Sequence, residues 1–98
     1  MTMRMMEFEY IYVVQQPVTP GRRTHRYEVA NLSSSATLGI IAWHGAWRQY
    51  WFMPCPETGW SEGCVLDIAA ALRKLNQDHK DELRKRRAER ALKTGEAR

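Results

Sequence analysis

Trp43-His44-Gly45-Ala46-Trp47-Arg48-Gln49-Tyr50-Trp51-Phe52 decides the fold, because it predicts a β-hairpin with aromatic side chains on both arms. Five of these ten residues are Trp, Tyr or Phe, which are types that favour strands. The arms are predicted at Ala36–Trp43 and Trp47–Met53, and Pro54 should end the second arm. We expect the turn at His44–Ala46, with Gly45 supplying the positive φ that tight hairpins require.

Two further strands are expected upstream of this hairpin. The segment Met6–Val14 alternates in polarity, as a half-buried strand does, with four apolar residues on one parity: Phe8, Tyr10, Tyr12 and Val14. A second strand is predicted at Thr24–Leu32. Proline and glycine make Pro17–Gly21 a loop between the two strands.

A long helix is expected after the hairpin. Ser61 is placed to cap its N-terminus, and Glu62 suits the positive end of the helix dipole. From Cys64 onward, apolar residues recur at helical spacing and predict a stripe that faces the core: Val65, Ile68, Ala69, Leu72 and Leu75. Charged residues at i, i+4 spacing then carry the helix towards solvent as far as Lys93.

These patterns together predict an α+β fold. It consists of a short antiparallel β-meander of three to four strands packed on one long C-terminal α-helix. Residues 1–77 are expected to form the compact domain. Residues 78–98 are expected to be a charged extension of the helix that is frayed at its end.

Composition disfavours several classes of function. No segment approaches the roughly 20 apolar residues of a membrane span, and no signal peptide is visible, so we expect a cytoplasmic protein with no membrane partner. Cys55 and Cys64 lie at none of the usual metal-ligand spacings, so we expect no metal and no cofactor. Whether these two cysteines form a disulfide is left open. We expect no catalytic residues, and a thiol hydrolase using Cys64 with His44 is the last-ranked alternative.

The aromatic hairpin is the first candidate binding site. Trp43, Tyr50 and Phe52 are expected to pack under the helix, while Trp47, Arg48 and Trp51 occupy the other face of the sheet. Core packing accounts for most such residues, yet one helix cannot cover aromatics on both faces. Because Trp and Arg dominate binding hot spots, the candidate binding residues here are Trp43, Trp47, Arg48, Tyr50 and Trp51.

The helix extension is the second candidate. The net charge of +4 belongs mainly to this end of the chain, where residues 78–98 hold eight basic and five acidic residues. The cluster Arg84, Lys85, Arg86 and Arg87 is either a solvated helix face or a site for nucleic acid or an acidic protein. Arg22, Arg23 and Arg26 form a smaller second patch.

The segment from Leu38 to Ile68 resembles a group of small, mostly uncharacterised proteins encoded by phages, prophages and other mobile elements. They share a strand reading Leu-Gly-x-Ile-x-Trp, then Trp-Arg-x-Tyr-x-Phe-x-Pro, a Thr-containing loop and a helix that opens with Cys-Leu. This chain has Val65 in place of that leucine. The matching residues here are Leu38, Gly39, Ile41 or Ile40, Trp43, Trp47, Arg48, Gln49, Tyr50, Phe52, Pro54, Thr58, Cys64 and Ile68. The resemblance implies a hairpin packed on a helix and an origin in a mobile element.

Small phage proteins of this size are often accessory factors, including inhibitors of bacterial defence complexes such as CRISPR effectors. By that analogy of origin, we expect a non-catalytic accessory protein in the cytoplasm of a bacterial host cell. Its partner would be a host protein or ribonucleoprotein complex. The alternative is a nucleic-acid-binding module that uses the basic C-terminal helix and exposed aromatics. A homodimer through the aromatic sheet face is also left open.

Overall fold

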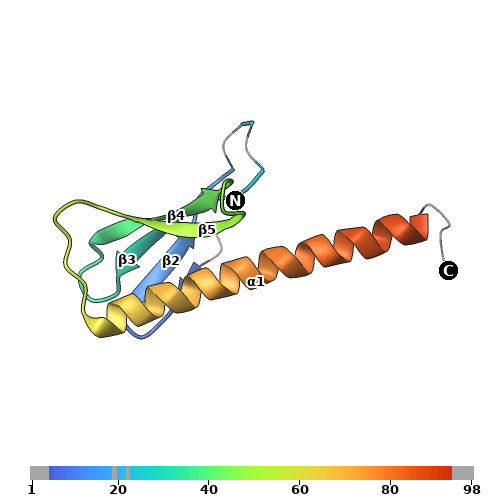
Figure 1. Cartoon of the computed structure of the whole chain (residues 1–98). Coiled ribbons are helices and arrows are strands. Elements are labelled where there is room, and N and C mark those ends of the chain that lie inside the picture. Colours follow the sequence, from blue (N-terminus) through green and yellow to red (C-terminus); the bar gives the residue numbers. More distant parts are fainter. Residues whose placement is uncertain (1–4, 19, 22, 94–98) are drawn as a thin grey trace.

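Five strands follow one another across a single antiparallel sheet, and one long helix follows the last strand (Figure 1). This computed structural model describes residues 5–18, 20–21 and 23–93. The elements are β1 (Met5–Glu7), β2 (Ile11–Gln15), β3 (Tyr27–Asn31), β4 (Thr37–His44), β5 (Gln49–Pro54) and α1 (Glu62–Lys93). Each strand pairs with the next in the chain, so the sheet is a meander. The predicted α+β class is confirmed, with one strand more than expected.

The extra strand arises where Met6–Val14 was predicted to be one strand. The chain turns back on itself after Glu7, and β1 pairs with β2 in antiparallel register. Aromatic residues on both sides of this turn imitate a single alternating strand. The turn reverses the expected parity, because Ile11 and Val13 enter the core, whereas Tyr12 and Val14 are half-buried on the other face.

The helix begins where the sequence predicts it. The backbone N–H of Cys64 donates to Ser61 Oγ at 3.2 Å, so Ser61 caps the first turn. The buried side chains of α1 are Cys64, Ile68, Ala71 and Leu75, which we call the buried stripe. The predicted stripe was rotated relative to this one: Val65 and Ala69 are exposed, because the centre of the contact with the sheet lies on Cys64 and Ala71 instead.

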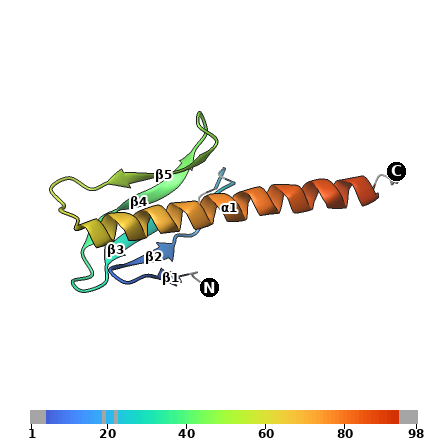
Figure 2. The same ribbon diagram turned by 60° about the horizontal axis from the view of Figure 1, so that its bottom comes forward.

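The core forms between this buried stripe and one face of the sheet (Figure 2). Among the described residues, no helix covers the opposite face, which we call the open face. The β4–β5 register, in which Ala42 opposes Trp51 and Trp43 opposes Tyr50, places these pairs on alternate faces. On the helix side the core consists of Ile11, Val13, Tyr27, Val29, Leu38, Ile41 and Tyr50.

Two polar side chains hold the helix in register on the sheet. Asn76 Oδ1 accepts a hydrogen bond of 2.7 Å from the backbone N–H of Tyr50, on the outer edge of β5. Asp67 Oδ2 accepts one of 2.7 Å from the backbone N–H of Tyr10, in the β1–β2 turn. The two ties bind opposite borders of the sheet, so they set the direction in which α1 crosses it.

The β4–β5 turn differs from its prediction in one respect. Gly45 does not have the positive φ that we expected there; instead Arg48 has a positive φ, of 55°. The backbone N–H of Arg48 donates to the Gly45 carbonyl at 3.2 Å. The turn therefore closes one residue later than predicted, on a residue type that rarely adopts this conformation.

Beyond the sheet, α1 continues as a projecting rod (Figure 1). The molecule is accordingly elongated, with extents of 53 × 28 × 28 Å. From Lys80 to Lys93 every residue of the helix is exposed. The expected fraying of residues 94–98, and Arg22 of the small arginine patch, lie outside the described residues.

Candidate functional site

The tip of the β4–β5 hairpin carries three aromatic rings: His44 and Trp51 lie on the open face, and Trp47 lies in the turn between the two strands. His44 stacks on Trp51 with ring centroids 3.8 Å apart and an interplanar angle of 14°. Trp47 stands at right angles to both rings, 4.7 Å from His44 and 5.7 Å from Trp51. Even so, Trp47 remains 62% exposed. This aromatic tip is thus preorganised by its own rings, while its outermost tryptophan is open to solvent.

Arg48 follows Trp47 directly and is also exposed. Within the described part of the chain, no ion pair or hydrogen bond is formed by its guanidinium group. Its positive φ places a strained backbone at the end of the hairpin. An exposed tryptophan beside an unpaired arginine is the arrangement expected of a binding hot spot.

Trp43 and Tyr50 lie on the helix side of the same hairpin. Trp43 contacts Tyr50 edge to face at 5.3 Å and packs on His79 of α1 at 4.3 Å. Tyr50 is buried, and burial raises its pKa to about 12, with a smaller contribution in the same direction from Tyr27. These two predicted site residues therefore serve first in packing, on the face opposite Trp51.

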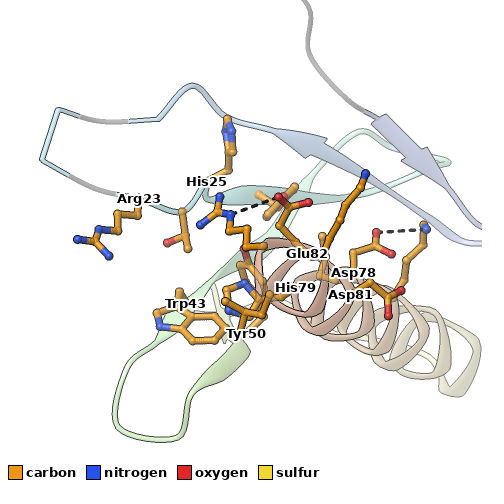
Figure 3. Close-up of a pocket in the computed structure, with 15 residues that line it drawn as sticks. Arg23, His25, Trp43, Tyr50, Asp78, His79, Asp81 and Glu82 are labelled. Atoms are coloured by element: carbon orange, nitrogen blue, oxygen red, sulfur yellow. Dashed lines mark hydrogen bonds and ion pairs between the residues drawn. The ribbon is translucent and has the colours of Figure 1, made fainter. Parts of the chain in front are cut away.

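A groove of about 1210 Å³ opens where α1 leaves the sheet (Figure 3). Its aromatic part is formed by Trp43, Tyr50 and His79, and its outer wall by the helix as far as Arg86. Two ion pairs neutralise much of this wall: Lys74 with Asp78 at 3.3 Å and Arg86 with Glu82 at 3.3 Å. With both signs of charge present, the groove has no single electrostatic preference.

The β2–β3 connection borders the groove on the other side. His25 Nδ1 lies 2.7 Å from the backbone oxygen of Gln16. That oxygen can only accept, so Nδ1 carries the proton and Nε2 faces Gln15. His25 is thereby held by its own loop, and Arg23 of the same loop also lines the groove (Figure 3).

Helical geometry places the consecutive basic residues 84–87 of α1 on different faces of the helix. Lys85 and Arg86 line the groove on the sheet side, whereas Arg84 and Arg87 do not. Arg84 lies 3.7 Å from Asp81, and both side chains are more than half exposed, so this ion pair contributes little. Four residues that are consecutive in sequence are therefore not one patch.

A smaller hollow of about 290 Å³ joins the hairpin tip to the helix. Its lining includes Trp47 and Arg48 from the tip and Asn76, His79 and Lys80 from α1. The sequence did not identify Lys80 as a candidate, because nothing in its local pattern distinguishes it from its charged neighbours. Tertiary packing alone places this lysine beside the exposed tryptophan.

His44 and His79 were also missed as members of the aromatic clusters. A signal was available for His79, because it follows Leu75 by four residues and so continues the buried stripe. For His44 the signal was the hairpin register, since His44 and Ala42 share a parity and Ala42 opposes Trp51.

The structure keeps apart Cys64 and His44, the two residues of the thiol hydrolase that is the last-ranked alternative. Cys64 is buried between α1 and the sheet, whereas His44 stacks with Trp51 on the open face. Cys55 and Cys64 are both free thiols. Over the described ranges of the chain, no group of three or more His, Cys, Asp or Glu side chains could hold a metal ion. Nor does any helix in those ranges have the length and apolarity needed to cross a membrane.

Comparison with known proteins finds one similar chain in a phage. The chain is 33% identical over 61 residues to an uncharacterized 9.3 kDa protein of Acholeplasma phage L2, and the match covers 62% of this chain and 78% of the phage protein. No family model and no solved structure matches the chain. The expected resemblance to small uncharacterised phage proteins is thus confirmed. The chain belongs to the family that includes this protein of Acholeplasma phage L2.

Proposed function

We propose that this protein is a non-catalytic phage accessory protein that binds a host macromolecule through the tip of the β4–β5 hairpin. The observation that carries the proposal is the 62% exposure of Trp47 beside the unpaired Arg48. A large aromatic ring held in place by neighbouring rings and open to water is the kind of side chain that serves as the anchor of a binding hot spot. The similarity to a phage protein supports the phage origin that the proposal assumes.

Inhibition of a bacterial defence complex, of the anti-CRISPR type, is the role to test first. The test mixes the purified protein with purified CRISPR effector complexes and measures both co-elution and target cleavage. Binding through the tip predicts co-elution and loss of cleavage. Complexes that neither co-elute with the protein nor lose cleavage would exclude this role.

The matched variants for this test are Trp47→Ala and Leu66→Ala. Both remove a large exposed apolar side chain, because Trp47 is 62% exposed and Leu66 is 61% exposed. Leu66 lies near the start of α1, away from the tip. We expect Trp47→Ala to weaken binding by at least about 30-fold, as hot-spot truncations do, and Leu66→Ala to leave it unchanged. Equal effects of the two variants would contradict a role for the tip.

A second candidate function is nucleic-acid binding, and a specific observation favours it. Lys80 lines the hollow beside Trp47 and Arg48, so the aromatic tip is continuous with the basic part of α1. From Lys80 to Lys93 the helix carries seven basic and three acidic residues. Binding of a polyanion should weaken steeply as salt rises, because counterions are released from the nucleic acid. Affinity that is independent of salt would exclude this candidate.

A further inference from the structure

Four basic residues of α1 share one side of the helix. Arg73 follows Ala71 and precedes Leu75 by two residues each, so it lies roughly 160–200° around the helix from the buried stripe. Lys80, Arg84 and Arg87 follow Arg73 at steps of seven, eleven and fourteen residues, which keeps all four within about 60° of one another. We call Arg73, Lys80, Arg84 and Arg87 the basic stripe; all are exposed.

No acidic side chain interrupts this stripe. Between Arg73 and Lys93 the helix holds four acidic residues, and at 100° per residue each lies at least about 80° from the position of Arg73. They are Asp78, Asp81, Glu82 and Glu89. Within the described chain, Arg73, Lys80 and Arg87 have no ion-pair partner. Arg84 has only the exposed contact with Asp81.

The stripe leads to the aromatic tip. Lys80 stands in its middle and also lines the hollow that Trp47 and Arg48 share. Fourteen residues separate Arg73 from Arg87, so the stripe is about 21 Å long. A row of cations beside an exposed indole ring is the chemistry that binds single-stranded nucleic acid: the cations contact successive phosphates, and a base stacks on the ring.

We propose that the basic stripe and the hairpin tip form one binding surface for single-stranded nucleic acid, with the backbone along α1 and a base on Trp47. The inference rests on the second candidate function and goes beyond it by naming the face of the helix. It excludes Lys85 and Arg86, although they belong to the same run in the sequence. Those two side chains line the groove on the opposite side.

The test compares two triple variants of the full-length chain that lose the same charge. One neutralises the stripe (Arg73→Gln, Lys80→Gln and Arg87→Gln), and the other neutralises the sheet side of the helix (Lys85→Gln, Arg86→Gln and Lys93→Gln). Glutamine keeps a high helix propensity, and circular dichroism verifies that both variants retain α1. The probe is a labelled oligo(dT) of about 16 nucleotides, titrated in fluorescence anisotropy between about 50 and 200 mM salt.

The stripe variant should bind on the order of 50-fold more weakly at the lowest salt, and its log–log salt slope should be shallower by about 2. The sheet-side variant should stay within about 3-fold of the wild type, because its cations lie away from the strand. Trp47→Ala should weaken binding of oligo(dT) by about 5- to 150-fold, as the loss of one stacked base does.

Three results would overturn the inference. Equal losses in the two triple variants would mean that net charge, and not a face, governs binding, while nucleic-acid binding itself would stand. A preference for a duplex of the same length would exclude the single strand. No binding of oligo(dT) by the wild type would remove the second candidate altogether, even if Trp47-dependent capture of a defence complex supported the first.

Discussion

At the scale of single residues, the hairpin shows how local environment changes chemistry. Tyr50 is only 8% exposed, enclosed by Tyr27, Trp43 and His79. Burial favours the neutral phenol, which raises the pKa of Tyr50 from its ordinary value of 10.0 to about 12. The folded protein therefore holds this proton at a pH where the unfolded chain has lost it.

This shift predicts alkaline destabilisation with a defined window. The raised pKa of Tyr50 contributes to the free energy of unfolding. This contribution is fully present below pH 10 and is lost as the pH rises from 10 to about 12, because the unfolded state deprotonates first. The free energy of unfolding, measured in urea, should fall across that window. Tyr50→Phe should flatten the fall, whereas Tyr12→Phe, at a half-buried position on the open face, should not. The same fall in both variants would contradict the assignment to Tyr50.

The backbone conformation of Arg48 predicts that one substitution can raise stability while it weakens binding. Its φ of 55° is costly for a residue with a Cβ and relaxed for glycine. Arg48→Gly should raise the free energy of unfolding by about 0.5 to 1 kcal/mol while weakening binding at the tip. Arg48→Lys keeps both the charge and the strain, so its stability should match the wild type. A destabilised Arg48→Gly would show that the arginine side chain itself supports the turn.

At the scale of elements, the contact between α1 and β5 depends on one amide. The outer edge of β5 presents the N–H of Tyr50, and Asn76 Oδ1 satisfies it at 2.7 Å. Asn76→Ala should cost about 1 to 3 kcal/mol, since a partly buried donor loses its acceptor. Asn76→Asp keeps an acceptor oxygen in the same place and should cost clearly less. Urea unfolding of both variants tests this, and equal losses would argue against the hydrogen bond.

Adjacent isoleucines of β4 report which face of the sheet is covered. Ile41 is fully buried under the helix, and Ile40 is half-buried on the open face. Ile41→Ala should destabilise by about 2 to 5 kcal/mol, because it leaves a cavity in the core. Ile40→Ala should cost about 1 kcal/mol. Comparable losses in thermal or urea unfolding would mean that a second layer covers the open face, as a homodimer through the sheet would.

At the scale of the whole molecule, the buried contacts of α1 end well before the helix does. The last buried residue of α1 is Leu75, and the helix continues to Lys93. A chain that ends at Lys80 should therefore keep its free energy of unfolding within about 0.5 kcal/mol. It should lose helical signal in circular dichroism, and it should lose affinity for oligo(dT). A large loss of stability would instead mean that the groove around His79 needs the second half of the helix.

Much of this architecture could be predicted from local pattern. Ser61 as the helix cap, the hairpin centred on residues 43–52 and the separation of Trp43 from Trp51 onto opposite faces all follow from propensity and period. These features depend on neighbours in the sequence, which is why the sequence contains them. The β1–β2 turn was missed because aromatic residues on both sides of it preserve an apparent alternation.

By itself, then, the sequence determined the α+β class, the hairpin followed by a capped helix and the aromatic character of the hairpin, because these depend on residues close together in the chain. Only the tertiary structure decided which residues share a surface. Asn76 reaches β5, Lys80 lies beside Trp47, and Arg86, unlike Arg87, lines the groove. Those placements depend on how α1 crosses the sheet, and that angle is set by contacts between residues far apart in the chain.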